Sequence, residues 1–104
     1  MNILRTIIGF FRLKVAVRNA EEAHRRSGER FYVIPSVNKR QLVICNRRNF
    51  RIMRMKKYFH RDMVIRDVDD ACIYYTAHRN DGSPMSRDER KRRAAGYYRW
   101  IAYD

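Results

Sequence analysis

The sequence predicts a small α+β domain: an N-terminal helix and a β-hairpin, then three further helices (α-β-β-α-α-α), around one small core. The chain opens with a long segment of helical periodicity, continues with two short runs of β-branched and aromatic residues, and ends in segments that carry helix-capping residues. Its 104 residues leave room for one domain. We therefore expect residues 1–104 to form a single basic domain, in which residues 1–17 could dock separately.

The first predicted helix covers about residues 3 to 26. Its apolar residues fall on one broad arc at 100° per residue: Ile3, Leu4, Ile7, Ile8, Phe10, Phe11, Val15 and Val17. The opposite side carries Asn2, Arg5, Thr6, Gly9 and Arg12. Gly28 suits the left-handed residue that follows a helix end. The arc is expected either to close over the hairpin as core or to project as an exposed stripe.

The hairpin is predicted from residues 30–34 and 42–45, which are rich in β-branched and aromatic side chains. Pro35 ends the first run, and a polar loop around Asn38 joins it to the second. The two runs are close enough along the chain to pair with one another as antiparallel strands.

Three further helices are expected. Asn46 is a good N-cap for a helix over Arg47–Tyr58, which turns Phe50 and Met53 inward. Asp67 can cap a short helix with Val68, Cys72 and Tyr75 on one face. A loop covers residues 78–84. The last helix begins with the capping box of Ser86 and Glu89, runs to about Tyr103, and has a packing stripe of Ala94, Tyr97, Tyr98 and Ile101.

Metal and cofactor sites are not expected. Cys45 and Cys72 lie in apolar strings with no second Cys or His at metal-ligand spacing, which is typical of buried, reduced thiols in a cytoplasmic protein. A disulfide between them would need Cα atoms within about 7 Å of each other. The three aspartates Asp67, Asp69 and Asp70 fit helix capping better than Mg²⁺ binding.

Positive charge dominates the chain, which has a formal net charge of +13. Residues 30–61 contain no Asp or Glu and hold Arg30, Lys39, Arg40, Arg47, Arg48, Arg51, Arg54, Lys56, Lys57 and Arg61. Such a concentrated positive field favours a polyanionic partner.

The leading functional hypothesis is a non-enzymatic protein that binds RNA or DNA mainly through phosphates. Arg47, Arg51 and Arg54 recur at helical spacing, and a second basic run opens the last helix beside its aromatic residues. The predicted contact residues are Arg47, Arg48, Arg51, Arg54, Lys56, Lys57, Arg90, Lys91, Arg92, Arg93 and Trp100.

Two alternatives remain open. An apolar arc with cations at its margin, over Ile3–Val17, also suits an anionic membrane surface or a protein partner. Arg5, Arg12 and Lys14 interrupt this segment, which argues against a signal peptide or a membrane span. The second alternative is a metal-independent, ribonuclease-like toxin that uses His, Tyr, Arg or Lys as acid, base and phosphate clamp. Its candidate histidines are His24, His60 and His78. No small-molecule substrate is evident.

Three strings resemble a family of small uncharacterised proteins from Bacteroides-type bacteria: AEEAHRRSGERFYVIP, LVICNRRNFRIMRMKKYF and CIYYTAHRNDG. The resemblance covers roughly residues 20 to 104 and leaves the apolar N-terminus as the variable part. It implies a cytosolic protein of bacterial or phage origin. Because the family has no known activity, the resemblance assigns no functional residue.

Overall fold

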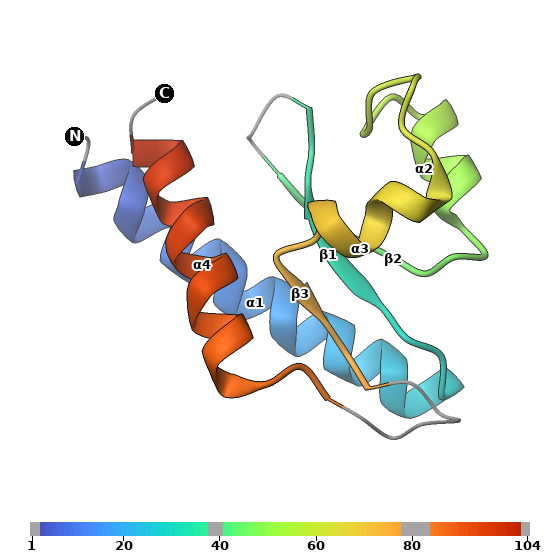
Figure 1. Ribbon diagram of the computed structural model, residues 1–104, viewed down its shortest axis with the longest axis horizontal. Coiled ribbons are helices and arrows are strands. Elements are labelled where there is room, and N and C mark those ends of the chain that lie inside the picture. The colour runs from blue at the N-terminus through green and yellow to red at the C-terminus, as the bar shows by residue number, and fades with distance from the viewer. Residues whose placement is uncertain (1–2, 38–40, 78–83, 103–104) are drawn as a thin grey trace.

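The computed structural model describes residues 3–37, 41–77 and 84–102, and it confirms the predicted α+β class (Figure 1). The elements along the chain are α1 (Ile3–Ser27), β1 (Tyr32–Pro35), β2 (Leu42–Cys45), α2 (Phe50–Met55), the 3-10 helix η1 (Ile65–Asp67), α3 (Val68–Ala71), β3 (Tyr74–Tyr75) and α4 (Arg87–Ala102).

The three strands form an antiparallel sheet of order β2-β1-β3. Tyr32 in the central strand β1 lies opposite Cys45 of β2 on one side and Tyr75 of β3 on the other. Further backbone bonds extend the pairing with the β3 segment, since the Thr76 amide donates to the Phe31 carbonyl at 2.9 Å. The central strand is therefore hydrogen-bonded along both edges.

Both faces of the sheet are covered by helices, and each face has its own apolar cluster. On one face Val33 joins Leu13 and Ala20 of α1 and Tyr97 of α4. On the other, Tyr32 and Ile34 join Phe50 of α2 and Val68 of α3. Side chains alternate between faces along a strand, so a sheet covered on both faces needs apolar residues at every position. This explains the continuous apolar strings at 31–34 and 42–45, and it replaces the single predicted core with two clusters.

The predicted helix through Tyr75 was wrong in its extent. Helix α3 ends at Ala71, and Tyr74 and Tyr75 form strand β3, an element missing from the predicted order. Asp67 does not cap this helix with its side chain; its carboxylate accepts a bond of 2.9 Å from the Val64 amide. The aromatic and β-branched residues after Cys72 favour a strand, and the open edge of β1 provides the partner.

The predicted helix over Arg47–Tyr58 was too long. Asn46 and Asn49 each accept a 2.8 Å bond from the other's backbone amide, and this pair closes a turn over residues 47–49. The helix begins only at Phe50 and ends at Met55. Lys57 follows with a left-handed backbone, φ 68°. Arg47 and Arg48 therefore precede the helix, and only Arg51 and Arg54 lie on it.

Helix α4 agrees closely with its prediction within residues 87–102. The Ser86 hydroxyl accepts a bond of 3.2 Å from the Glu89 amide, which is one half of the capping box. The Glu89 carboxylate instead pairs with Arg92 and Arg93. Tyr97 and Ile101 are buried, and Ala94 and Tyr98 pack against the same cluster. Cys45 and Cys72 are buried and free, also as predicted.

Gly9 sets how closely α1 approaches α4. A Cβ atom at this position would lie 2.1 Å from Cδ1 of Ile101 and 3.5 Å from Cε2 of Tyr97. The first turns of α1 and the last turns of α4 thus lie side by side, as Figure 1 shows. The sequence places Gly9 opposite the apolar arc, and the structure buries that opposite side against α4.

The opposed faces of α2 generate a stability prediction. Phe50 is buried and stacks on Phe59 with ring centroids 5.5 Å apart, whereas Arg51 is exposed. Phe50→Ala should lower the free energy of unfolding by about 3–5 kcal/mol, because it leaves a cavity. Arg51→Ala, the matched control, should change it by no more than about 0.5 kcal/mol. Urea denaturation of both variants checks this, and equal midpoints would contradict it.

Candidate functional site

The side of α1 that faces the core carries small residues. Gly9, Leu13, Ala16 and Ala20 are its buried positions. Three of these four are Gly or Ala, which lets the helix backbone lie close to α4 and the sheet. A bulky side chain at Gly9 would collide with Ile101, because even a Cβ atom there would lie 2.1 Å from Cδ1 of that residue.

The large apolar residues of α1 consequently point outward. Leu4 is 65% exposed and Phe11 is 59% exposed. We call the whole set the outer face of α1, and it comprises Ile3, Leu4, Ile7, Ile8, Phe10, Phe11 and Val15. The sequence left open whether this apolar arc closes over the hairpin as core or projects as an exposed stripe, and the structure supports the exposed stripe. Val17 differs from the others because it is partly buried against the core.

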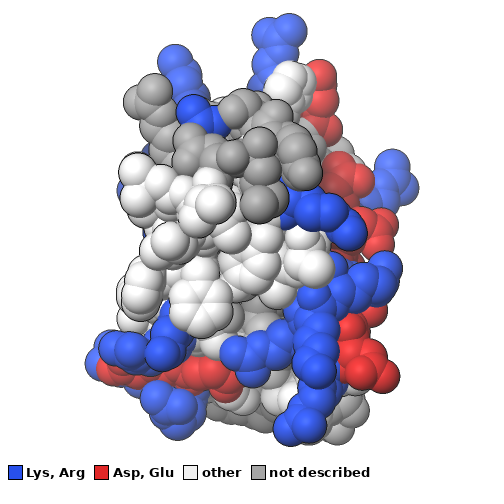
Figure 2. Space-filling view, turned by 90° about the vertical axis from the view of Figure 1, so that its left-hand side faces the viewer, with Lys and Arg blue, Asp and Glu red and all other residues white. Residues whose placement is uncertain are grey.

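Cations accompany the outer face, and the acids of the helix come only after its last apolar member. Residues 3–20 contain Arg5, Arg12, Lys14 and Arg18, and the first acidic residue of the chain is Glu21. Figure 2 views the molecule from the side where α1 begins and α4 ends, and shows a broad uncharged surface whose lower and right-hand border carries Lys and Arg together with some Asp and Glu. The surface thus combines exposed apolar side chains with positive charge.

A shallow groove of about 610 Å³ continues this surface toward the sheet. Ile8, Phe11 and Val15 line it from α1, and Leu42 and Ile44 line it from β2. Because β2 is the outer strand on this side of the sheet, the apolar surface extends from the helix onto the sheet edge.

Three of the six predicted cations before, within and just after α2 bind residues of their own chain. Arg47 pairs with Asp69 at 3.3 Å, and Arg48 pairs with Glu29 at 2.6 Å. Arg54 donates to the Met63 carbonyl at 2.8 Å. The remaining members of this group are exposed, and no contact within the described part of the chain engages their charges: Arg51, Lys56 and Lys57.

The predicted residues on α4 differ from one another in role. The Arg90 guanidinium lies 5.0 Å from the ring centroid of Tyr74, and Arg92 pairs with Glu89 on the surface. Lys91 is exposed, and Trp100 is 38% exposed, off the packing stripe as expected. Helices α2 and α4 cover opposite faces of the sheet. The eleven predicted residues are therefore divided between two sides of the molecule.

Arg93 is a structural residue that ties α4 to the end of α3. Its side chain is only 20% exposed and pairs with Glu89 at 2.6 Å. The same guanidinium donates to the carbonyls of Asp69 and Cys72, each at 2.7 Å. Hydrogen bonds from Arg92 and Arg93 lower the pKa of Glu89 to about 2, so this carboxylate is ionised at neutral pH.

The two histidines in the described part of the chain show only local contacts. The His24 ring is 2.8 Å from the Glu29 carbonyl, and His60 lies 3.5 Å from the Asp62 carboxylate. His78 lies outside the described residues. Within the described ranges, no group of three or more His, Cys, Asp and Glu residues could hold a metal ion. No catalytic arrangement emerges from these contacts.

Comparison with models of known protein families, with curated proteins and with solved structures finds no match to this chain. Among the described residues, no helix combines the length and apolar character needed to cross a bilayer. The function must therefore be argued from the surfaces themselves.

The contrast between neighbouring arginines on α4 can be tested. Arg93→Met should lower the free energy of unfolding by about 1.5–3 kcal/mol, because two carbonyls lose a charged donor. Arg92→Met is the control: Arg92 is 72% exposed and pairs only with Glu89 among the described residues. It should change stability by less than about 1 kcal/mol. Chemical denaturation measures both, and similar losses would show that Arg93 has no special structural role.

Proposed function

We propose that this protein attaches to anionic membrane surfaces through the outer face of α1. The observation that carries this proposal is the exposure of seven large apolar side chains on one helix that also bears four cations and no acid before Glu21. Contiguous exposed apolar patches are uncommon on isolated proteins and typically mark interaction sites. A helix of this kind lies in the interface of a bilayer, with its apolar side chains below the headgroups.

Charge favours a membrane over a second copy of the chain. Two copies, each with a formal net charge of +13, would repel one another as their outer faces approached. Nucleic acid supplies negative charge but offers little apolar surface to cover Leu4, Ile7 and Phe11. An anionic bilayer satisfies both requirements, and each Lys or Arg near its surface contributes about 1 kcal/mol of attraction.

Vesicle binding tests the proposal. Phe11→Ser should weaken binding to vesicles of mixed phosphatidylserine and phosphatidylcholine by at least about tenfold, because burial of a Phe side chain is worth about 1.5–3 kcal/mol. The control is Ile52→Ser, since Ile52 is 53% exposed on α2, away from the outer face. It should bind like the unchanged protein. Co-sedimentation measures the affinities.

Two results would contradict membrane attachment. One is equal binding to the anionic vesicles and to pure phosphatidylcholine, with no effect of Phe11→Ser. The other is a failure to bind either vesicle, with Phe11→Ser instead abolishing association with an acidic protein. The second result would assign the outer face to a protein partner.

A second candidate function is phosphate-mediated binding of RNA or DNA by the α2 region. The supporting observation is that Arg51, Lys56 and Lys57 are exposed and that no contact in the described ranges neutralises them. Such residues track a phosphate backbone without reading the sequence of bases. This is a smaller contact set than the eleven residues predicted from the sequence.

Salt dependence tests the second candidate. Three phosphate contacts imply a slope of about −3 for log K against log salt on duplex DNA. The double variant Lys56→Gln/Lys57→Gln should reduce this slope by about 2. Arg25→Gln/Arg87→Gln removes the same charge from exposed positions elsewhere and should leave the slope nearly unchanged. Fluorescence anisotropy measures the binding constants. If both double variants reduced the salt slope equally, the DNA would be attracted only by the net charge of the protein and not by the α2 region.

A further inference from the structure

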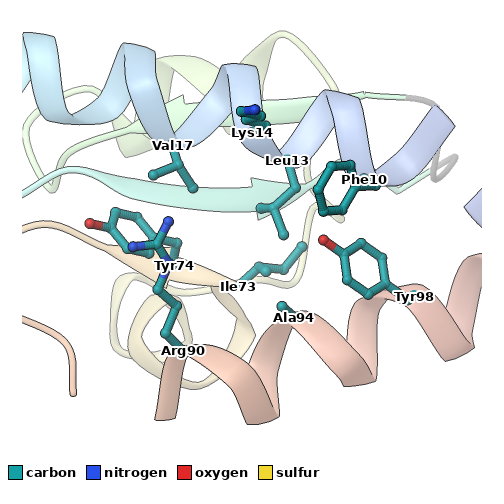
Figure 3. Close-up of a pocket in the computed structure, with 9 residues that line it drawn as sticks. All are labelled: Phe10, Leu13, Lys14, Val17, Ile73, Tyr74, Arg90, Ala94 and Tyr98. Carbon is teal, nitrogen blue, oxygen red and sulfur yellow. The ribbon is translucent and has the colours of Figure 1, made fainter. Parts of the chain in front are cut away.

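A cavity of about 270 Å³ lies between α1, α4 and β3, on the side of α1 that faces α4 (Figure 3). It is distinct from the shallow groove between α1 and β2, with which it shares no lining residue. Its volume is slightly below the range of about 300–1,000 Å³ that is usual for sites of drug-sized ligands. The cavity therefore suits a small or slender ligand.

The interior of the cavity is apolar. Leu13, Ile73 and Ala94 line it, and Figure 3 shows their side chains directed into the same space between the helices. Phe10 and Tyr98 close one end, where their ring centroids are 6.3 Å apart. The space exists because Ala94 contributes only a methyl group where α4 faces α1. A ligand here would have to be largely hydrocarbon.

Polar and charged groups lie around the mouth. Lys14 and Arg90 are exposed lining residues from the two helices, and the Arg90 guanidinium lies over the Tyr74 ring. Among the described residues, one acid contacts this lining, since Glu21 accepts a hydrogen bond from the Tyr74 hydroxyl. The described lining and its contacts thus bring two cations and one carboxylate to the mouth, and this net positive charge would attract an anionic ligand group.

Tyr98 adds a hydrogen-bond donor on the cavity side. Figure 3 shows its hydroxyl directed toward the space beside Leu13. Burial raises the pKa of Tyr98, and burial together with the Glu21 contact raises the pKa of Tyr74 to about 12. Both phenols are therefore protonated and uncharged at neutral pH, so neither adds to the negative charge of Glu21.

We propose that this cavity binds one unbranched fatty acid of medium length, with its chain between α1 and α4 and its carboxylate at Lys14 and Arg90. A group of the size of a water molecule takes about 30 Å³, so a volume of 270 Å³ holds about nine methylene or methyl groups. With the carboxylate carbon at the mouth, this corresponds to a fatty acid of about ten carbons. The proposal does not depend on membrane attachment, because none of its contacts requires a bilayer.

Titration calorimetry of the unchanged protein tests the contribution of the ligand's hydrocarbon chain and that of its carboxylate separately. Affinity should rise up to about fourfold per methylene from hexanoate to decanoate, because each buried methylene contributes about 0.8 kcal/mol. It should then level off once the cavity is filled. Decanol, which has the same chain without charge, should bind at least tenfold more weakly than decanoate. The stoichiometry should be one.

Two pairs of variants locate the site. Ala94→Leu fills the cavity and should weaken decanoate binding at least tenfold, whereas Ala95→Leu makes the same change at the exposed neighbouring position and should not. Arg90→Gln should weaken decanoate binding but not decanol binding. Arg87→Gln removes an equal charge one turn earlier, outside the cavity lining, and should affect neither ligand.

The proposal is overturned if decanoate and decanol bind equally, if affinity keeps rising well beyond ten carbons, or if Ala94→Leu and Ala95→Leu bind alike. Should Ala94→Leu fail to fold, the chain-length series and the Arg90→Gln comparison decide the matter by themselves. If the fatty-acid proposal fails, the proposal of membrane attachment can still stand, because the vesicle experiment tests Phe11 and not Ala94 or Arg90.

Discussion

The central strand β1 imposes the main constraint on this fold. It is hydrogen-bonded along both edges, and its side chains are apolar toward both faces of the sheet. A short sheet of this kind cannot leave either face in water, so helices must cover both. α1 and α4 cover one face and α2 and α3 cover the other. The way in which these helices pack on the sheet determines which of their apolar and charged side chains remain on the surface of the molecule.

Close packing on one face explains the two features that we connect with function. Because α1 meets the core mainly through the small residues Gly9, Ala16 and Ala20, most of its bulky residues project outward, and Leu13 is the buried exception. Because α4 presents Ala94 where it faces α1, the two helices leave a space between them. Small residues on the two helices are thus associated with both an exposed apolar face and a partly open apolar cavity.

The cations illustrate how sequence and structure divide the information. Their number and clustering are plain from the sequence, which gives a formal net charge of +13. The residues that they bind cannot be read from the sequence, because Arg93 binds carbonyls of residues more than twenty positions away and Arg47 binds Asp69. A periodic pattern describes which side of a helix a residue occupies, but not whether another segment arrives there to bind it.

The sequence by itself determined the features that depend on near neighbours along the chain. Helical periodicity located α1 and α4, β-branched runs located the hairpin, and Ser86 marked the start of α4. Only the tertiary structure decided which side of α1 turns inward, that residues 74–75 form a strand, and that Arg93 belongs to the framework. These outcomes depend on contacts between distant segments: the position of Ile101 against Gly9, the open edge of β1, and the carbonyls at the end of α3. Local patterns contain no information on such contacts.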